Sequence, residues 1–471
     1  MSKVRLIIDG TEIEVDEGTN LIEAAKQIGL EIPHFCYHPG LSPDGNCRMC
    51  LVEVEKIPKP VIACKTAAVE GMVVKTNTAL IEKARSSVME FLLINHPLDC
   101  PTCDQAGECK LQDYYMDYDL QPSRYKEKKV QKRKMVDLGA GVMLDEERCV
   151  VCRRCVRFCR EIAGKEELYV QERGHNSMVA TFPGKDMTNP YSGNTVDVCP
   201  VGALTSKDFR YKKRVWYLSQ TDSICPGCSR GCNISIHYEG NVVYRLKPRE
   251  NLEVNKYWMC DFGRYDYTYV NENRRLKAAY RKGGALVEGC YEEVITNLRA
   301  VLENYDPLQV AFIASAQESV EAIDVFSSFA KDKFFADTIY FSKNEPEHSY
   351  HDDILITDDK NPNLEHVKVL GLKPVNDLVP DIQAVIVQRN LSEQDLGLIM
   401  KRGLKVLALF ATNHTKVDEM AQVILPIPTY AEQSGCFVNC NGMTQSFKKA
   451  FDPQGEAKTI QEYIAEIGAL L

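Results

Sequence analysis

Sixteen cysteine and histidine residues fall into four groups with spacings typical of metal or cluster ligands. The first two groups are spaced C-x10-C-x2-C-x13-C and H-x3-C-x2-C-x5-C. The third is a C-x2-C-x2-C-x3-C run followed by a distant Cys-Pro, and the fourth is spaced C-x2-C-x3-C-x27-C. The candidate ligands are Cys36, Cys47, Cys50 and Cys64; His96, Cys100, Cys103 and Cys109; Cys149, Cys152, Cys155 and Cys199; and Cys225, Cys228, Cys232 and Cys260.

The spacing of the first group favours a [2Fe–2S] cluster over zinc. A zinc ribbon normally has two C-x2-C pairs, whereas this group has only one. The intervening loop, YHPGLSPDGN, is rich in Gly, Pro and small polar residues. Such a loop can direct backbone N–H groups at inorganic sulfide. The fourth group fits [4Fe–4S], with zinc as the alternative.

The third group has the ferredoxin spacing for a [4Fe–4S] cluster. No second run of three cysteines lies between residues 160 and 199, so Cys199 is expected to complete the site and Cys159 to remain free. Nearby guanidinium groups could stabilise a reduced, anionic cluster, or they could form a solvated or interface-paired helix face. These arginines are Arg148, Arg153, Arg154, Arg157 and Arg160.

The second group, taken alone, suits zinc as well as iron–sulfur. Three neighbouring cluster motifs favour a [4Fe–4S] cluster here too, since clusters in series form an electron relay. His96 would then be the single non-cysteine ligand. Its neutral imidazole makes a cluster less negative than a thiolate would.

The composition indicates a globular chain of several domains. Its 471 residues predict roughly three to five domains. The net charge of −9 argues against nucleic acid as the main partner. Nineteen cysteines, an odd number, without a signal-like N-terminus argue against disulfides. No apolar run approaches the roughly 18 residues of a membrane span, so we expect a cytoplasmic protein.

Local patterns predict the elements that carry these groups. Asp9-Gly10 predicts a hairpin turn within a β-rich region, and residues 79–95 predict an amphipathic helix ending at His96-Pro97. Residues 121–135 predict a solvated, charged linker. From about residue 290, strand-like and helix-like segments alternate, which predicts βαβ units over a mostly parallel sheet. The face of the 79–95 helix expected to be buried carries Leu80, Ala84, Val88, Phe91 and Leu92.

Four stretches resemble the large iron–sulfur subunit of respiratory complex I, the proton-pumping NADH:quinone oxidoreductase. They are PHFCYHPGLSPDGNCRMCLVEV, HPLDCPTCDQAGECKLQD, RCVVCRRCVRFCREI and DVCPVGALTSKDFRYKKRVW. The resemblance is strong over residues 1–275. Iron-only hydrogenases and the relay subunits of NAD-linked hydrogenases and formate dehydrogenases share the N-terminal part. The motifs therefore identify a superfamily rather than one particular complex.

The resemblance implies an α+β multidomain fold. It places a β-grasp [2Fe–2S] ferredoxin-type domain at 1–78, a [4Fe–4S] domain with one His and three Cys ligands at 79–118, a ferredoxin-like [4Fe–4S] domain at 138–217, a molybdopterin-oxidoreductase-type [4Fe–4S] domain at 218–275, and a shortened molybdopterin-oxidoreductase-like α/β domain at 276–471. The C-terminal stretch AQVILPIPTYAEQSGCFVNCNGM resembles that superfamily's aliphatic strand followed by an acidic residue and Phe-Val-Asn. Two departures argue against a molybdenum centre. The 276–471 region is short, and Phe262 stands where active members carry a lysine.

The resemblance further implies an electron-relay subunit with one [2Fe–2S] and three [4Fe–4S] clusters. Electrons would pass from a flavin- and NADH-binding subunit through the first, second and third clusters, in that order, to other peripheral-arm subunits and quinone, at the cytoplasmic face of the inner membrane. The fourth cluster would lie off this path. We expect no catalytic residue, flavin, NAD or molybdopterin in the chain. Cys290, Cys436 and Cys440 are expected to be buried free thiols.

Two alternatives remain open from the sequence. One is a relay subunit of a soluble NAD-linked hydrogenase or formate dehydrogenase, and the other is a zinc scaffold without redox function.

Overall fold

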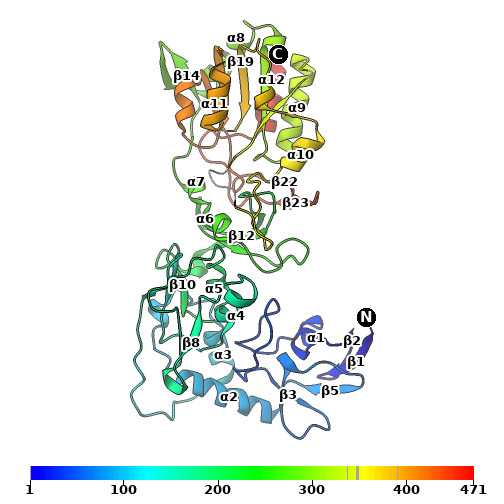
Figure 1. Ribbon diagram of the computed structural model, residues 1–471, viewed down its shortest axis with the longest axis vertical. Helices are drawn as coiled ribbons and strands as arrows, with labels where there is room; N and C mark the ends of the chain where they lie inside the picture. Colours follow the sequence, from blue (N-terminus) through cyan, green and yellow to red (C-terminus); the bar gives the residue numbers. More distant parts are fainter. Residues whose placement is uncertain (1, 337, 346–349, 390, 402, 471) are drawn as a thin grey trace. The chain divides into compact units, whose positions relative to one another are not determined.

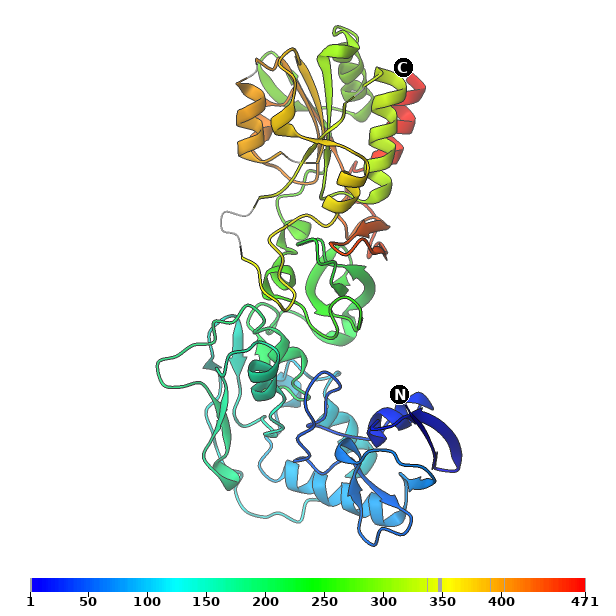
Figure 2. The same ribbon diagram turned by 45° about the vertical axis from the view of Figure 1, so that its right-hand side comes forward.

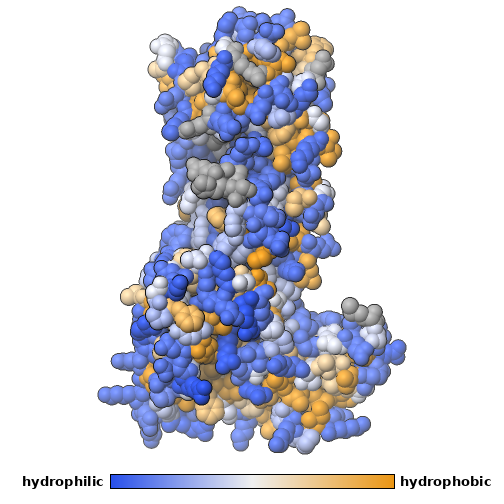
Figure 3. Space-filling model, in the orientation of Figure 1, coloured by the Kyte–Doolittle hydropathy of each residue, from blue (hydrophilic) through white to orange (hydrophobic). Residues whose placement is uncertain are grey.

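The chain forms two compact units, Met1–Tyr217 and Leu218–Leu471. The computed structural model describes residues 2–336, 338–345, 350–389, 391–401 and 403–470. No helix within these residues is long and apolar enough to cross a membrane. The surface on the side drawn in Figure 3 is mostly hydrophilic, with apolar side chains scattered over it.

The first unit begins with a five-stranded mixed sheet that carries one helix (Figure 1). Its elements are β1 (Lys3–Ile8), β2 (Thr11–Asp16), α1 (Leu21–Gln27), β3 (Leu51–Val54), β4 (Val61–Ile62) and β5 (Met72–Lys75). The strand order is β2-β1-β5-β3-β4, with β1 and β5 parallel. Asp9 and Gly10 have φ of 47° and 85°, as a two-residue type I′ turn requires, which confirms the predicted hairpin. Asn20 caps α1 by accepting from the Ile22 and Glu23 N–H groups.

The helix predicted at 79–95 is present as α2 (Ala79–Leu93), capped by the Thr78 side chain. The predicted buried face is wrong, because Leu80 and Phe91 are 51% and 75% exposed. The fully buried side chains of α2 are instead Ile81, Arg85 and Met89.

The contacts of Arg85 explain why α2 buries a different face from the predicted one. Its guanidinium donates to the Leu51 carbonyl over 3.2 Å and lies 5.4 Å from the centre of the Tyr118 ring. The face of α2 that carries Arg85 therefore packs against β3 and α3 (Lys110–Tyr118). Hydrophobicity alone could not identify that face. An arginine counts as polar, but its methylene groups can be buried when its charged group has hydrogen-bond partners.

The rest of the first unit is built from short elements. They are β6 (Val136–Asp137), β7 (Val142–Leu144), α4 (Arg154–Glu161), β8 (Tyr169–Gln171), β9 (Met178–Ala180), α5 (Asn194–Asp197) and β10 (Leu204–Ser206). A three-stranded sheet has the order β10-β7-β6, and β8 pairs with β9. The preceding 121–135 segment is largely exposed, as predicted, and ion pairs such as Lys134–Asp99 (2.6 Å) anchor its end.

The second unit begins with a three-stranded antiparallel sheet and two short helices. These are β11 (Ser219–Ile224), β12 (Asn233–Glu239), β13 (Val242–Pro248), α6 (Asp261–Tyr265) and α7 (Thr268–Asn271). A small two-stranded sheet of β22 (Gly435–Val438) and β23 (Thr444–Phe447) contacts β11.

An eight-stranded sheet forms the core of the second unit, in the order β15-β14-β21-β20-β19-β16-β17-β18. Its strands are β14 (Ala279–Lys282), β15 (Ala285–Glu288), β16 (Val310–Ser315), β17 (Tyr340–Ser342), β18 (Lys373–Pro374), β19 (Ala384–Gln388), β20 (Val406–Ala411) and β21 (Val423–Pro426). The six strands from β21 to β18 are parallel, which confirms the predicted βαβ pattern.

Helices cover both faces of this sheet (Figure 2). They are α8 (Tyr291–Leu302), α9 (Val320–Phe334), α10 (Leu364–Val369), α11 (Glu393–Met400) and α12 (Ile460–Leu470). Side chains of α8, α9 and α12 share one core with one sheet face, and Ile399 of α11 belongs to the core on the other. Two-sided burial explains the nearly continuous apolar strands of this region.

Candidate cluster-binding sites

The four cysteines of the first group come together in a loop region beside the first sheet. The Cys36 thiol forms hydrogen bonds with the Cys47 and Cys64 thiols, and Cys64 also contacts Cys50. These hydrogen bonds lower the pKa of Cys36 and raise that of Cys64. A set of mutually contacting thiols, three of them buried, has the donor chemistry of a [2Fe–2S] site.

The second group follows the C-terminus of α2 and ends at the N-terminus of α3. His96 comes three residues after the last residue of α2, and Cys109 is the residue before α3. Burial lowers the pKa of His96 to about 4, so its imidazole is neutral at pH 7 and keeps a lone pair for a metal. Burial raises the pKa of Cys109 to about 11. Cys103 is buried, whereas Cys100 is exposed.

The third group wraps the N-terminus of α4, which carries Cys155. Between the first three cysteines, Val151 and Arg153 have φ of 49° and 62°, a left-handed conformation that is costly for residues other than glycine. Burial raises the pKa of Cys149 to about 12 and that of Cys152 to about 11. Without a metal these thiols would therefore be protonated at pH 7.

The fourth group lies in the second unit, between β11 and α6. All four of its cysteines line one small cavity, together with Gly227 and Gly263. The Cys225 N–H donates to the Cys232 carbonyl over 2.9 Å, which closes the loop between β11 and β12. Cys260 caps α6, and burial raises its pKa to about 11.

Two glycines allow the backbone to approach these thiols closely. A Cβ atom at Gly202 would lie 2.1 Å from the Cys103 sulfur, and one at Gly263 would lie 2.6 Å from the Cys225 sulfur. Any side chain at these positions would displace a thiol. These glycines carry no sequence signal of their own, because the contacts join residues that are distant in the chain.

Two buried arginine side chains also fit the presence of clusters at these sites. The Nε atoms of Arg154 and Arg157 are buried and have no hydrogen-bond partner within the described part of the chain. Inorganic and thiolate sulfur in a cluster would be acceptors of the kind that such donors need. Among the described residues, no three His, Cys, Asp or Glu side chains are placed to hold a single metal ion.

The third group has contacts with both of the other groups in the first unit. Arg154 and Arg157 of α4 donate to backbone carbonyls in the loop of the first group. On the side of the second group, Arg148 pairs with Asp99 over 3.0 Å. Arg148, Arg154 and Arg157 are therefore paired across the contacts between ligand groups, as one of the two interpretations predicts.

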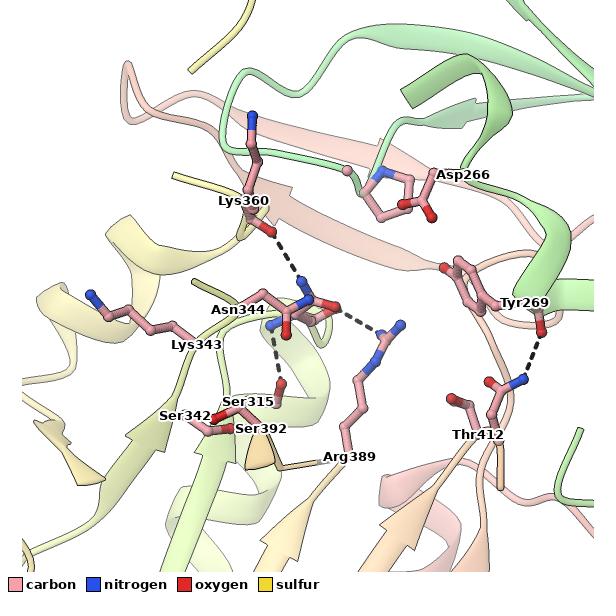
Figure 4. Close-up of a pocket in the computed structure, with 14 residues that line it drawn as sticks. Asp266, Tyr269, Ser315, Ser342, Lys343, Asn344, Lys360, Arg389, Ser392 and Thr412 are labelled. Atoms are coloured by element: carbon pink, nitrogen blue, oxygen red, sulfur yellow. Dashed lines mark hydrogen bonds between the residues drawn. The ribbon is translucent and has the colours of Figure 1, made fainter. Parts of the chain in front are cut away.

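A polar pocket of about 420 Å³ lies at the carboxyl ends of β16, β17, β19 and β20 (Figure 4). Arg389 extends into the middle of the labelled residues, where it donates to the Gln317 carbonyl over 3.1 Å. It also pairs with Glu318 over 3.2 Å. Burial raises the pKa of Asp266, another lining residue, to about 6. Lys360 lines both this pocket and the cavity of the fourth group, and its Nζ lies 5.8 Å from the centre of the Phe262 ring.

The three remaining C-terminal cysteines are not buried as predicted. Cys290 and Cys440 are exposed, and Cys436 is partly exposed. Cys290 immediately precedes α8, Cys436 lies on the two-stranded sheet, and Cys440 lies between β22 and β23. Their positions at element ends and on a small sheet explain the exposure.

Five family descriptions match consecutive parts of the chain. These are "2Fe-2S iron-sulfur cluster binding domain" at residues 1–79, "NADH-ubiquinone oxidoreductase-G iron-sulfur binding region" at 85–124, "NADH-quinone oxidoreductase subunit 3, ferredoxin-like domain" at 139–205, "Molybdopterin oxidoreductase Fe4S4 domain" at 218–272 and "Molybdopterin oxidoreductase" at 367–469. The predicted α+β multidomain fold, with its cluster-binding domains in this order, is thereby confirmed.

Curated relatives carry matching names. A G-type subunit of NADH-quinone oxidoreductase from Rickettsia felis is 44% identical over 322 residues, which is 68% of this chain and 48% of the relative. "NADH-ubiquinone oxidoreductase 75 kDa subunit" of Reclinomonas americana is 39% identical over 74% of this chain and 50% of the relative. The chain thus spans about half the length of the curated relatives it matches.

One similar solved structure is entitled "Crystal structure of NAD+-reducing [NiFe]-hydrogenase in the H2-reduced state". It is 28% identical, and the match covers 45% of this chain and 91% of that chain with a TM-score of 0.41.

Proposed function

With 68% of its length aligned to the Rickettsia felis relative, this chain belongs to the family of large iron–sulfur subunits of NADH-quinone oxidoreductase, and we propose that it is an electron-relay subunit of that enzyme. The observation that carries this proposal is the grouping of three candidate ligand sets within one compact unit, with contacts from the third set to both others. A zinc scaffold has no need for such contacts between sites.

The sixteen residues of the four groups are the proposed ligands. Cys36, Cys47, Cys50 and Cys64 would hold [2Fe–2S], and the other three groups would each hold [4Fe–4S], with His96 as the one nitrogen ligand. When bound, these clusters supply one-electron oxidation and reduction. The five predicted domains, 1–78, 79–118, 138–217, 218–275 and 276–471, remain our proposed division of the chain.

The burial and charge of the proposed ligands influence both iron binding and the reduction potential of each cluster. Burial raises the pKa of Cys149, Cys152 and Cys260, so these thiolates persist at pH 7 only when iron stabilises their charge. Burial keeps His96 neutral, so its site carries one negative charge fewer than a four-thiolate site. Together with hydrogen bonds to sulfur, these differences in charge set the reduction potentials.

The contacts favour a spatial order that differs from the order in the chain. We expected the histidine-containing second group to be in the middle of the relay. The backbone contacts instead make the third group the neighbour of both others, through Arg157 to Cys36 and through Lys110 to Pro200. A relay that follows these contacts would have the third group in the middle, and we propose this order in place of the expected one.

We propose that no molybdopterin is bound. Phe262 occupies the chain position where active members carry a lysine, and Lys360, which lines the same cavity from a distant segment, lies over the Phe262 ring. The paired Arg389 already extends into the polar pocket (Figure 4). The proposed partners are a flavin- and NADH-binding subunit and other peripheral-arm subunits. The assembly would be held at the cytoplasmic face of the inner membrane.

Metal analysis of the anaerobically purified chain tests the proposal. The four proposed clusters require about 14 iron atoms per chain, with matching acid-labile sulfide and little zinc. A protein that contains mainly zinc would reject the relay function. Purification of the native complex separates the two redox functions, because a soluble hydrogenase or formate dehydrogenase would contain nickel or molybdenum subunits in place of membrane subunits.

A further inference from the structure

Arg157 joins the third group to the first through two backbone carbonyls. One terminal nitrogen donates to the Cys36 carbonyl and the other to the Ser42 carbonyl. Arg157 lies on α4, two residues after Cys155. A candidate ligand of the first site is therefore held by a side chain from the helix that carries a candidate ligand of the third site. A planar guanidinium can bind both carbonyls at once.

Arg154 makes a second connection of the same kind. It donates to the Tyr37 carbonyl, next to Cys36, and over 3.3 Å to the Val198 carbonyl, next to Cys199. Its charge interacts with thiols of both groups: Cys152, Cys199, Cys36 and Cys47. Its side chain is thus hydrogen bonded to the backbone beside both sites.

Both arginines are deeply buried, with 9% and 4% of the residue exposed for Arg154 and Arg157. Each retains an Nε donor without a partner in the described structure. Burying a cation is costly unless nearby negative charge offsets the loss of hydration. Within the described residues, the hydrogen bonds of these two side chains go to neutral carbonyls. The Glu161 carboxylate offsets part of the charge of Arg157, and the thiols of both groups interact with the charge of Arg154.

We propose that Arg154 and Arg157 are positioning residues shared by the first and third cluster sites. They fix the ligand loop of the [2Fe–2S] site from a different domain, and their charge favours the reduced form of the centre there. This inference rests on the proposed relay function and adds specific residues to it. A substitution on α4 should therefore change a centre whose four ligands lie between residues 36 and 64.

The test uses the full chain, purified anaerobically, with the variants Arg154→Gln and Arg157→Gln. Electron paramagnetic resonance gives the spectrum and midpoint potential of the [2Fe–2S] centre. We expect both variants to lower that potential, because a nearby cation is lost, and to alter the spectrum of the centre. Arg154→Lys and Arg157→Lys retain the charge but not the forked geometry, so they should restore most of the potential and leave the spectrum altered.

Arg160→Gln is the matched control. Arg160 is on the same helix, but its side chain is 54% exposed and, among the described residues, pairs only with Glu161. We expect no change in the [2Fe–2S] centre. An equal potential shift in this control, or an unchanged spectrum and potential in both Gln variants, would overturn the proposal.

The Lys variants decide the question if the Gln variants lose iron. A wild-type [2Fe–2S] spectrum in both Lys variants would then reject the positioning role. The wild-type protein separates this result from failure of the relay function. Absence of a [2Fe–2S] signal in the wild type rejects the relay, whereas a normal wild-type signal with unaffected variants rejects only the role of the arginines.

Discussion

The backbone N–H of Lys110 donates a hydrogen bond to the carbonyl of Pro200 over 3.1 Å. Lys110 follows Cys109 of the second group, and Pro200 follows Cys199 of the third. The hydrogen bond thus joins the chain beside the last candidate ligand of one site to the chain beside the last candidate ligand of the other. Two residues further on, Gly202 lies against the Cys103 thiol, so this short segment contributes to both sites.

Gly202→Ala should disrupt the second site more than the third. The added Cβ would lie 2.1 Å from the Cys103 sulfur, so that thiol would have to move. We expect a loss of about four iron atoms per chain, the content of one [4Fe–4S] cluster. Iron analysis and the loss of one [4Fe–4S] resonance signal measure this. Gly397→Ala, where the added carbon meets open space, is the control and should retain all iron.

His96→Cys should retain a cluster at the second site with a more negative midpoint potential. A thiolate adds a negative charge where the neutral imidazole had none, which disfavours the reduced state. Redox titration followed by electron paramagnetic resonance measures the shift. His175→Cys places a thiol at an exposed histidine and should change nothing. An unchanged potential in His96→Cys would show that His96 is not a ligand.

Local sequence signals predicted the elements that depend on neighbouring residues. The Asp9-Gly10 turn, the existence of α2 and the parallel strands of the second unit all follow from turn geometry and apolar periodicity. Those signals act over a few residues. They also identified the four ligand groups, whose assignment to clusters remains a prediction.

What the sequence did not predict depends on partners far along the chain. The buried face of α2 is set by Arg85, which reaches back to Leu51, and no periodicity rule anticipates a buried arginine. The third group is the spatial neighbour of the first because Arg157 binds the carbonyl of Cys36, a residue 121 positions away. A contact between residues so far apart in the chain leaves no local signal in the sequence.

Cys159→Ala and Cys199→Ala should have opposite outcomes. Cys159 is fully buried within α4, and burial raises its pKa to about 12, which makes it an inert thiol at pH 7. If Cys199 is the fourth ligand of the third site, its removal should cost about four iron atoms, while Cys159→Ala should keep the full iron content and spectrum. The reverse pattern would show that Cys159 is the ligand.

Asp266→Asn should stabilise the second unit near neutral pH. Burial raises the pKa of Asp266 from 3.8 to about 6, so the folded state binds this proton more tightly than the unfolded state. Its contribution to the free energy of unfolding is then greatest below about pH 4 and is lost as the pH rises to about 6. The amide removes that loss. The gain at pH 7 should be below about 1 kcal/mol, because Asp266 is an exposed residue at the pocket and solvent screens its charge. Thermal unfolding should show a gain that shrinks from pH 7 to pH 4.5, and the exposed control Asp381→Asn should show none at either pH.

Glu432→Ala should strongly destabilise the second unit. Glu432 is the acidic residue of the C-terminal motif, and it pairs with Arg274 over 2.7 Å while both side chains are almost fully buried. It also accepts hydrogen bonds from the Thr429 N–H and hydroxyl. Its removal leaves Arg274 buried without its carboxylate, which should cost about 3–5 kcal/mol in the free energy of unfolding.

Chemical denaturation followed by tyrosine fluorescence measures this loss. The iron of the first unit reports whether the damage is local, and we expect the [2Fe–2S] signal to be retained in the folded variant. Glu456→Ala is an acidic control, since the Glu456 carboxylate accepts a hydrogen bond from the Ala278 N–H rather than pairing with a buried cation. If the two variants were equally stable, the motif's acidic residue would have a role other than pairing with Arg274. Glu432→Ala combined with Arg274→Met should recover part of the lost stability, because it removes the unpaired charge as well.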